Sequence, residues 1–442
     1  MMRTLGREII STRQEKLAKL AQIEPKRVLT TLAHHIDEVW LREAYRRTRK
    51  DGAVGIDGVT AAQYEADLEA NLASLLERFK SGRYRAPAVR RVHIPKPGKA
   101  KKTRPIGIPT LEDKVLQRAV LMVLETVYEQ DFLDCSYGFR AGRSAHQALE
   151  ARWQGLMEMG GGWIIDLDIQ SFFDDVDWGN HRGFLDQRVR YGVIRRAIGK
   201  WLNAWVMEAE AVRHPDRGSP QGGVVSPMLS NLYLHEVLDV WFEHDVKPRL
   251  GGRAFEIRFA DDAALVFERE EDARRVLAVL SKRFEKYGLR LHPEKTRLVE
   301  FRSPPRAERG GSQRERSFGL LGFTHYWGRS RKGRWVVKRK TAKDRFTRAL
   351  RAVGRWCRAH RHWPVADQQA ALRRKLQGHY AYYGITGNGR ALACFLYEVR
   401  RLWRKWLSRR CWHARMTWEK FNRLCAHCPL PQPRVVHSIF RA

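Results

Sequence analysis

The chain has 442 residues, and its 83 Lys and Arg outnumber its 49 Asp and Glu, which gives a formal charge of +34. Hydrophobic residues make up 43% of it, enough to bury a core, so wholesale disorder is excluded and two or three domains are expected. A small neutral substrate does not account for this excess charge, because self-repulsion destabilises a compact state. A polyanionic partner does, because neutralised phosphates release counterions; a basic protein without a specific partner is the alternative.

Neither export nor membrane insertion is indicated. The first 20 residues lack the apolar core of a signal peptide, and no uncharged apolar run reaches the roughly 18 residues that a membrane helix needs. The six Cys are scattered, with Cys135 alone in the first 350 residues, so no disulfide framework is predicted. We therefore expect a soluble cytoplasmic protein in a reducing compartment, with no membrane partner.

Helices and short strands alternate in the first two thirds of the chain. Residues 1–80 predict a helical extension, because apolar residues recur three and four apart on both sides of a glycine-rich break. Residues 89–109 predict two strands around a basic turn, and 113–130 an amphipathic helix. The apolar stretch 161–169 is typical of a strand in a covered sheet, while 255–268 predicts a hairpin with two carboxylates at its turn.

The last third is the most basic part of the chain. Residues 274–301 predict a helix, a stop at Gly288 and a strand, followed by a charged loop at 303–317. From about residue 330 the pattern predicts helices to the end. Residues 331–442 hold 28 Lys and Arg against four acidic residues, and seven of the 15 Trp. Cations mixed with flat rings suit contacts with a sugar-phosphate backbone and stacking on bases.

The acidic pair Asp261 and Asp262 stands in the apolar sequence F-A-D-D-A-A-L-V-F. Two ionised carboxylates at one turn repel each other, so basic side chains or a divalent cation must compensate them. Mg²⁺ prefers one or two carboxylates together with waters and substrate phosphates, and nucleotidyl transfer uses two such ions. Taken alone, the pair is equally consistent with a solvated turn.

A second acidic segment, I-I-D-L-D-I-Q-S-F-F-D, places Asp166 and Asp168 on one face of a strand by alternation. Either could supply the third carboxylate of a two-ion site, although aspartates capping a strand end are the alternative. Further on, R-G-S-P-Q-G-G-V-V-S-P contains small residues that predict a close approach of the backbone to a nucleotide or template strand.

Eight motifs then occur in a telling order: I-P-K-P-G, R-P-I-G-I-P-T, S-Y-G-F-R-A-G-R-S-A-H-Q-A-L, D-I-Q-S-F-F-D, G-S-P-Q-G-G-V-V-S-P-M-L-S-N, F-A-D-D, G-L-R-L-H-P-E-K-T and L-G-F. This series resembles the motifs of reverse transcriptases, specifically the group II intron-encoded branch, over roughly residues 50–325. The resemblance implies an α+β right-hand polymerase with fingers and an antiparallel palm sheet, followed by an all-α basic thumb or X domain. The expected parts are a helical N-terminal extension at 1–80, fingers and palm at 81–325, and the thumb or maturase domain at 326–442.

The resemblance also implies roles for individual residues. Asp168, Asp261 and Asp262 match the catalytic carboxylates, which would hold two Mg²⁺ ions, or Mn²⁺ in substitution. Asp166 has no such match and is expected to be supporting or surface-exposed. The family's usual tyrosine before Ala-Asp-Asp is Phe259 here, which predicts altered nucleotide or primer handling and not inactivity. The residues expected at the incoming nucleotide are Lys96, Arg104, Phe173, Gln221 and Lys295.

Three of these nucleotide assignments have open alternatives. Lys96 shares a basic loop with Lys99 and Lys101, either of which could grip the triphosphate instead. Phe173 would clash with a ribose 2′-hydroxyl and so favour dNTPs, with core packing as the alternative. Lys295 would protonate the pyrophosphate as a general acid, with a solvated lysine as the alternative.

The basic tail resembles the maturase region, and five of its residues are expected to bind RNA: Arg401, Arg404, Lys405, Arg409 and Arg410. The tyrosines at 380, 382 and 383 are expected in the core. Cys425 and Cys428 form a C-x-x-C, but a zinc site needs four ligands, and recruiting Cys411 or His427 is speculative. The endonuclease domain that family members often carry is expected to be absent.

The function implied is that of an RNA-directed DNA polymerase that adds dNTPs to a primer on an RNA template. It would also bind its group II intron RNA to assist splicing and retrotransposition. The expected partners are intron RNA, an RNA template with a DNA primer, dNTPs and target DNA, with association to the nucleoid when DNA is bound. The alternatives are a maturase that acts mainly as an RNA-binding splicing factor, or a related enzyme used in defence, CRISPR-linked acquisition or diversity generation.

Overall fold

The computed structural model describes residues 2–25, 27–95, 103–190, 192–204, 206–208, 211–213, 222–304, 317–410 and 416–438. The chain forms two compact units. Unit 1 comprises Met1–Ala148 and Trp163–Leu298, and unit 2 comprises Leu149–Gly162 and Val299–Ala442. This division differs from the three consecutive parts expected from the sequence, because the N-terminal helices share unit 1 with the central sheet.

The N-terminal helices of unit 1 pack on one long buried helix, α5 (Leu111–Tyr128). Their buried residues belong to the same core cluster as those of the central sheet, and the Trp40 indole donates a hydrogen bond to the Ala119 carbonyl (2.9 Å). The first 80 residues are therefore part of the core of unit 1, although they are helical as predicted. The helices here are α1 (Met2–Ile23), η1 (Leu32–His35), α2 (Glu38–Arg47), α3 (Ala61–Ala66) and α4 (Leu68–Lys80).

A four-stranded sheet in the order β2-β1-β5-β6 contains the predicted basic hairpin. Strands β1 (Val89–Pro95) and β2 (Thr103–Ile108) are antiparallel, with Arg90 opposite Ile108 and Ile94 opposite Arg104. Strand β5 (Val206–Glu208) runs parallel to β1, and β6 (Ala211–Arg213) pairs with β5. The loop joining β1 and β2 lies outside the described residues.

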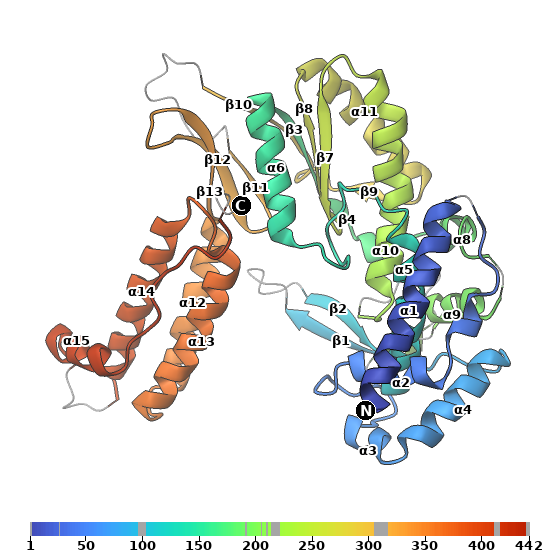
Figure 1. Cartoon of the computed structure of the whole chain (residues 1–442). Helices are drawn as coiled ribbons and strands as arrows, with labels where there is room; N and C mark the ends of the chain where they lie inside the picture. The colour runs from blue at the N-terminus through green and yellow to red at the C-terminus, as the bar shows by residue number, and fades with distance from the viewer. Residues whose placement is uncertain are drawn as a thin grey trace. The chain divides into compact units, whose positions relative to one another are not determined.

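The central sheet has the order β10-β3-β8-β7. Strand β8 (Asp262–Phe267) pairs antiparallel with both β3 (Gly161–Leu167) and β7 (Ala254–Phe259), and β10 (Arg297–Arg302) forms the other edge. From Ala263 to Phe267, β8 is buried at every residue, as a central strand covered on both faces should be. Figure 1 shows α11 (Glu270–Lys286) beside this sheet. The predicted antiparallel sheet and acidic hairpin are confirmed.

A long helical segment links the motif G-S-P-Q-G-G-V-V-S-P to β7. It begins as α10 (Ser226–Leu234) and continues through π-helical turns at His235–Asp239 and Trp241–Val246 and a 3₁₀ turn at Lys247–Arg249. Wide π turns are rare and recur near functional sites. Unit 1 also contains β4 (Ile169–Gln170), α7 (Phe172–Asp175), α8 (Trp178–Asp186), α9 (Gly192–Leu202) and β9 (Arg290–Leu291), and α6 (Ala145–Met159) leads into unit 2.

The C-terminal part of unit 2 contains strands where helices were expected. Strands β11 (Ser317–Leu320), β12 (Phe323–Arg329) and β13 (Trp335–Thr341) form an antiparallel sheet, so the prediction of an all-helical part from residue 326 is wrong for its first 16 residues. In β13, burial alternates, with Val337, Arg339 and Thr341 turned inward. Because charged residues also occupy the buried positions of β13, the alternation of buried and exposed residues is not visible in the sequence as an alternation of apolar and polar residues.

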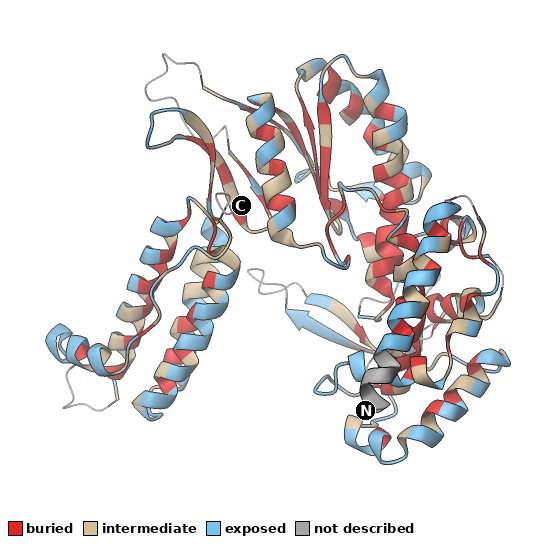
Figure 2. Ribbon diagram, viewed as in Figure 1, coloured by how far each residue is buried: buried red, intermediate tan, exposed pale blue. Residues whose placement is uncertain are grey.

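The rest of unit 2 is helical, as predicted. Its helices are α12 (Lys343–Ala359), α13 (Val365–Tyr383), α14 (Gly389–Leu407) and α15 (Trp418–His427). Buried residues recur every three or four positions along α14, from Leu392 to Leu407, so one stripe faces the core and the other faces carry cations (Figure 2). Tyr380 is buried, and Tyr382 and Tyr383 are half-buried and pack on Phe323, which confirms that these rings are structural. Among the described residues, no helix combines the length and apolar character needed to cross a bilayer.

Candidate active site

The acidic pair lies at a tight hairpin turn, as predicted. Phe259 pairs with Asp262 across β7 and β8, so Ala260 and Asp261 alone form the turn, and Ala260 has the left-handed φ of 57°. Asp261 is half-buried and Asp262 is exposed, while the strand behind them is buried. The apolar strands thus end in two carboxylates at the surface of unit 1.

Asp168 lies at the end of the neighbouring strand. In the β3–β8 pairing, Asp166 is opposite Ala264 and Leu167 is opposite Ala263. Asp168 follows Leu167 directly, so continuing this antiparallel register by one residue brings it opposite Asp262. Asp168 precedes Asp261 and Asp262 by more than 90 residues in the sequence, and the three predicted carboxylates therefore come to the same end of two adjacent strands.

A short segment downstream of α11 fixes the backbone of Asp168. The His292 amide donates to the Asp168 carbonyl (2.8 Å), and the Thr296 hydroxyl contacts both the amide and the carbonyl of Asp168 (3.3 Å each). Lys295, from the same segment, places its ammonium 2.8 Å from both carboxylate oxygens of Asp168. The predicted proton donor is thus the counterion of a predicted metal ligand.

Asp166 is engaged elsewhere. Its carboxylate lies 3.6 Å from the Arg297 guanidinium at the start of β10. This ion pair agrees with the supporting position expected for Asp166, since the charge is compensated by a side chain of the same unit.

Phe173 is partly buried in the first turn after β4. Ser171 has a left-handed φ of 46°, and α7 then buries Phe172 and leaves Phe173 packed on it, with ring centroids 5.3 Å apart. Phe173 also packs on the main core of unit 1. Phe173 is therefore both packed and partly exposed, which is compatible with either expectation.

Of the other expected nucleotide-binding residues, Arg104 is exposed on β2, whereas Lys96 and Gln221 lie outside the described residues. Gly222, directly after Gln221, has a φ of 115°, and a Cβ there would lie 2.2 Å from the Gly107 carbonyl of β2. The sequence predicted that the backbone of this motif comes close to a nucleotide or template strand. At Gly222 the backbone instead comes close to β2 of the same chain.

Asp113, a buried carboxylate that the sequence analysis did not single out, supports the backbone after Gly222. Asp113 accepts hydrogen bonds from the Tyr84 hydroxyl, the Trp201 indole (2.7 Å) and the Gln117 amide (3.0 Å). The Gln117 carbonyl oxygen in turn accepts from the Val224 amide (2.7 Å). Burial raises the pKa of Asp113 to about 6 despite these donors. In the sequence, an Asp in the first turn of a helix cannot be told from an ordinary N-terminal acidic residue.

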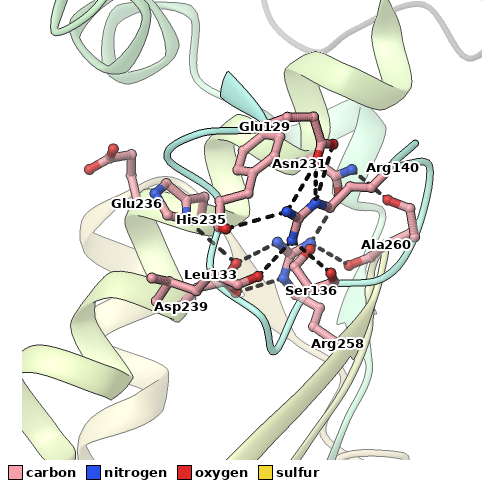
Figure 3. Close-up of polar contacts among 12 residues, drawn as sticks. Glu129, Leu133, Ser136, Arg140, Asn231, His235, Glu236, Asp239, Arg258 and Ala260 are labelled. Carbon is pink, nitrogen blue, oxygen red and sulfur yellow. Dashed lines mark hydrogen bonds and ion pairs between the residues drawn. The ribbon is translucent and has the colours of Figure 1, made fainter. Parts of the chain in front are cut away.

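A second missed residue, Arg258, lies beneath the acidic turn (Figure 3). Its guanidinium is fully buried and donates to both oxygens of Asp239 (2.6 and 2.5 Å), to the Asn231 side chain (3.0 Å) and to the Ala260 carbonyl (3.1 Å). Burial alone would raise the pKa of Asp239, but the Arg258 guanidinium keeps it below its usual value. An arginine within the apolar run F-E-I-R-F was the available signal.

Cys135, Asp239 and Glu256 are the one group among the described residues whose ligand atoms could surround a metal ion. Arg258 already neutralises Asp239, and burial raises the pKa of Glu256 well above its usual value, which favours its neutral form over a metal-binding carboxylate. This cluster is structural. Within the described part of the chain, Cys425 and Cys428 gather no third ligand, and Cys411 lies outside it.

The five expected RNA-binding residues divide into two groups. Arg401, Lys405 and Arg409 are exposed at four-residue intervals. Arg404 donates to the Met416 carbonyl (2.9 Å) and lies over the Trp418 ring (4.3 Å), and Arg410 donates to the carbonyls of Arg361 and Trp363. The second group fastens α14 to its neighbours within unit 2.

Comparison with known proteins agrees with this geometry. Residues 94–325 match the family described as Reverse transcriptase (RNA-dependent DNA polymerase). Protein YkfC of Escherichia coli K12 is 38% identical over 239 residues, which cover 52% of this chain and 61% of that protein. The group II intron-encoded protein LtrA of Lactococcus lactis is 33% identical over 227 residues, 50% of this chain and 37% of LtrA.

A plant relative is more distant. Nuclear intron maturase 4, mitochondrial, of Arabidopsis thaliana is 27% identical over 143 residues, 31% of this chain and 18% of that protein. The chain thus spans less than two thirds of each of these three relatives. With the family match covering more than half of its residues, the chain belongs to the reverse transcriptase family and is related to its group II intron-encoded members.

Proposed function

We propose that this chain is an RNA-directed DNA polymerase that adds dNTPs to a primer on an RNA template. The observation that carries the proposal is the register that puts Asp168 opposite Asp262, beside the Asp261 turn, in a chain of this family. Unit 1 would supply the fingers and palm of a right-hand polymerase, and the helices of unit 2 its thumb.

The donor set at this edge fits a hard divalent cation. Three carboxylates from two adjacent strand ends are the oxygen ligands that Mg²⁺ prefers, with Mn²⁺ as a substitute. Asp168, Asp261 and Asp262 would hold two ions, which when bound activate the attacking hydroxyl and stabilise the leaving pyrophosphate. The Lys295 ammonium is half exposed, so it can leave Asp168 for a phosphate at little cost.

The remaining assignments follow the resemblance to the family. Phe173, fixed on Phe172, would exclude a ribose 2′-hydroxyl, and exposed Arg104 would contact the triphosphate together with Lys96 and Gln221. Phe259 would pack at the primer end without the hydroxyl of the usual tyrosine.

We also propose that the chain binds intron RNA to assist splicing and retrotransposition, in the cytoplasm and at the nucleoid on target DNA. This is favoured by the exposed cations on the helices of unit 2, and LtrA is by name encoded by a group II intron. A maturase acting mainly as an RNA-binding splicing factor is the second candidate.

Primer extension on matched RNA and DNA templates, with dNTPs and separately with rNTPs, tests the polymerase proposal. The expected result is extension on RNA with dNTPs and little with rNTPs. Phe173→Ala should admit rNTPs, whereas Val279→Ala, which shortens an exposed apolar side chain on α11, should not. Intron splicing without any extension by the intact chain would instead favour the RNA-binding candidate.

A further inference from the structure

Phe139 is an exposed aromatic ring that the proposed chemistry leaves without a role. It is 60% exposed, whereas Gly138 and Arg140 on either side of it are buried. Its backbone has the left-handed φ of 56°, which strains a bulky residue. An exposed ring on a strained backbone adds little to the core of unit 1, so its role is sought in binding.

The segment carrying Phe139 is bonded directly to the acidic hairpin. The Arg258 amide donates to the Cys135 carbonyl (2.8 Å), and the Tyr137 amide donates to the Arg258 carbonyl (2.9 Å). A Cβ on Gly138 would lie 2.3 Å from the Ala260 nitrogen. The residue before Phe139 therefore touches the residue before Asp261.

Both neighbours of Phe139 are also locked by side chains (Figure 3). The Asn231 amide donates to the Gly138 carbonyl (2.6 Å), and Asn231 itself is held by the buried Arg258 guanidinium. The Arg140 guanidinium donates to the carbonyls of Leu133 (2.6 Å) and Ser136 (2.9 Å) and pairs with Glu129 (3.0 Å). The ring of Phe139 thus projects from a rigid base.

We propose that Phe139 is a stacking platform for a base or sugar of the primer–template at the catalytic edge. This inference rests on the proposed function: if the three aspartates act on the primer 3′ end, the nucleic acid must lie beside the turn that Gly138 touches. An exposed ring on a pre-organised base loses little entropy when it packs, and every base offers a flat face to it. The contact is apolar and independent of sequence.

Equilibrium binding of a labelled RNA–DNA primer–template, without dNTPs, tests this role separately from catalysis. Phe139→Ala should weaken binding by about 5- to 150-fold, the range for losing one stacked base. Phe139→Trp should bind as the wild type does. Because no charge is removed, the slope of log Kd against log salt should not change. Val279→Ala, on an exposed apolar residue of α11, is the matched control.

Phe139→Gly separates binding from folding. Glycine adopts this φ without strain, so its melting temperature should equal or exceed that of the wild type while its binding falls as in Phe139→Ala. Unchanged primer–template binding by both variants would overturn the inference, as would a loss confined to the KM for dNTPs, which would place the ring at the incoming nucleotide. If the wild type binds primer–template but never extends it, the polymerase proposal fails while the binding test still stands.

Discussion

Two buried charged residues show how single side chains hold backbone segments of unit 1 in place. Asp113 holds Gln117 and through it the backbone that follows Gly222, whereas Arg258 holds the carbonyl of Ala260 in the acidic turn. Each fixes its segment through hydrogen bonds made inside the protein, where the low dielectric strengthens them.

The pKa of about 6 for Asp113 predicts a pH-dependent stability. In the folded state this pKa is raised, so the stability that Asp113 contributes is present in full below its unfolded pKa and is lost as the pH rises through about 6. The free energy of unfolding of wild type minus that of Asp113→Asn should be larger at pH 5 than at pH 8 by roughly 1 kcal/mol. Urea denaturation at both pH values measures it, and an identical difference at both would contradict the prediction.

Loss of the buried Arg258–Asp239 ion pair should destabilise the fold. Arg258→Gln leaves Asp239 as an uncompensated buried carboxylate, which should lower the free energy of unfolding by about 3–5 kcal/mol. Adding Asp239→Asn removes that charge and should recover a large part of the loss. The paired measurement is a double-mutant cycle by denaturant unfolding; equal stability of the single and double variants would argue against the ion pair.

At the level of elements, the acidic hairpin depends on the close packing of Gly138 against its turn. Gly138→Ala would place a methyl group 2.3 Å from the Ala260 nitrogen, so the turn has to shift. We expect primer extension to fall at least tenfold, because a displacement of about 1 Å costs roughly 100-fold in a positioned site. Gly52→Ala, where a Cβ meets nothing within 4 Å, is the control and should retain full activity.

The sequence predicted this hairpin well because an apolar run with two central acids has few other solutions. The same reasoning found the segment of Lys295 but not its pairing with Asp168, since contacts between distant segments leave no local pattern. The sequence analysis expected a helix where β13 lies. In this strand Arg339 is buried, and its guanidinium donates a hydrogen bond to the Leu149 carbonyl (3.2 Å). A buried arginine in a strand cannot be told from a surface cation by composition.

Over the whole molecule, the positive charge is concentrated in residues 331–442, whereas the proposed chemistry lies in unit 1. Affinity for nucleic acid and catalysis should therefore be separable by mutation. The cations to change are those whose side chains do not hold the backbone of unit 2. Arg401, Lys405 and Arg409 are exposed, with Arg401 paired to Glu398 on its own helix (3.0 Å), whereas Arg404 and Arg410 donate to backbone carbonyls.

Neutralising Arg401, Lys405 and Arg409 to Gln should weaken RNA binding and reduce the slope of log K against log salt by up to about 2, from roughly 0.7 per lost phosphate contact on single strands. The melting temperature should change little. Equilibrium binding from 50 to 200 mM salt measures both quantities. An unchanged slope would show that these residues do not contact phosphates.

The most direct test of the central claim is primer extension by three single variants, Asp168→Ala, Asp261→Ala and Asp262→Ala, at saturating Mg²⁺. The control is Asp245→Ala, an exposed aspartate within the second π-helical turn, Trp241–Val246. The account predicts that each of the three loses extension while primer–template binding and the melting temperature are retained, and that the control stays active. Robust extension by Asp168→Ala would contradict the account, because Asp168 would then be near the acidic hairpin without being needed for catalysis.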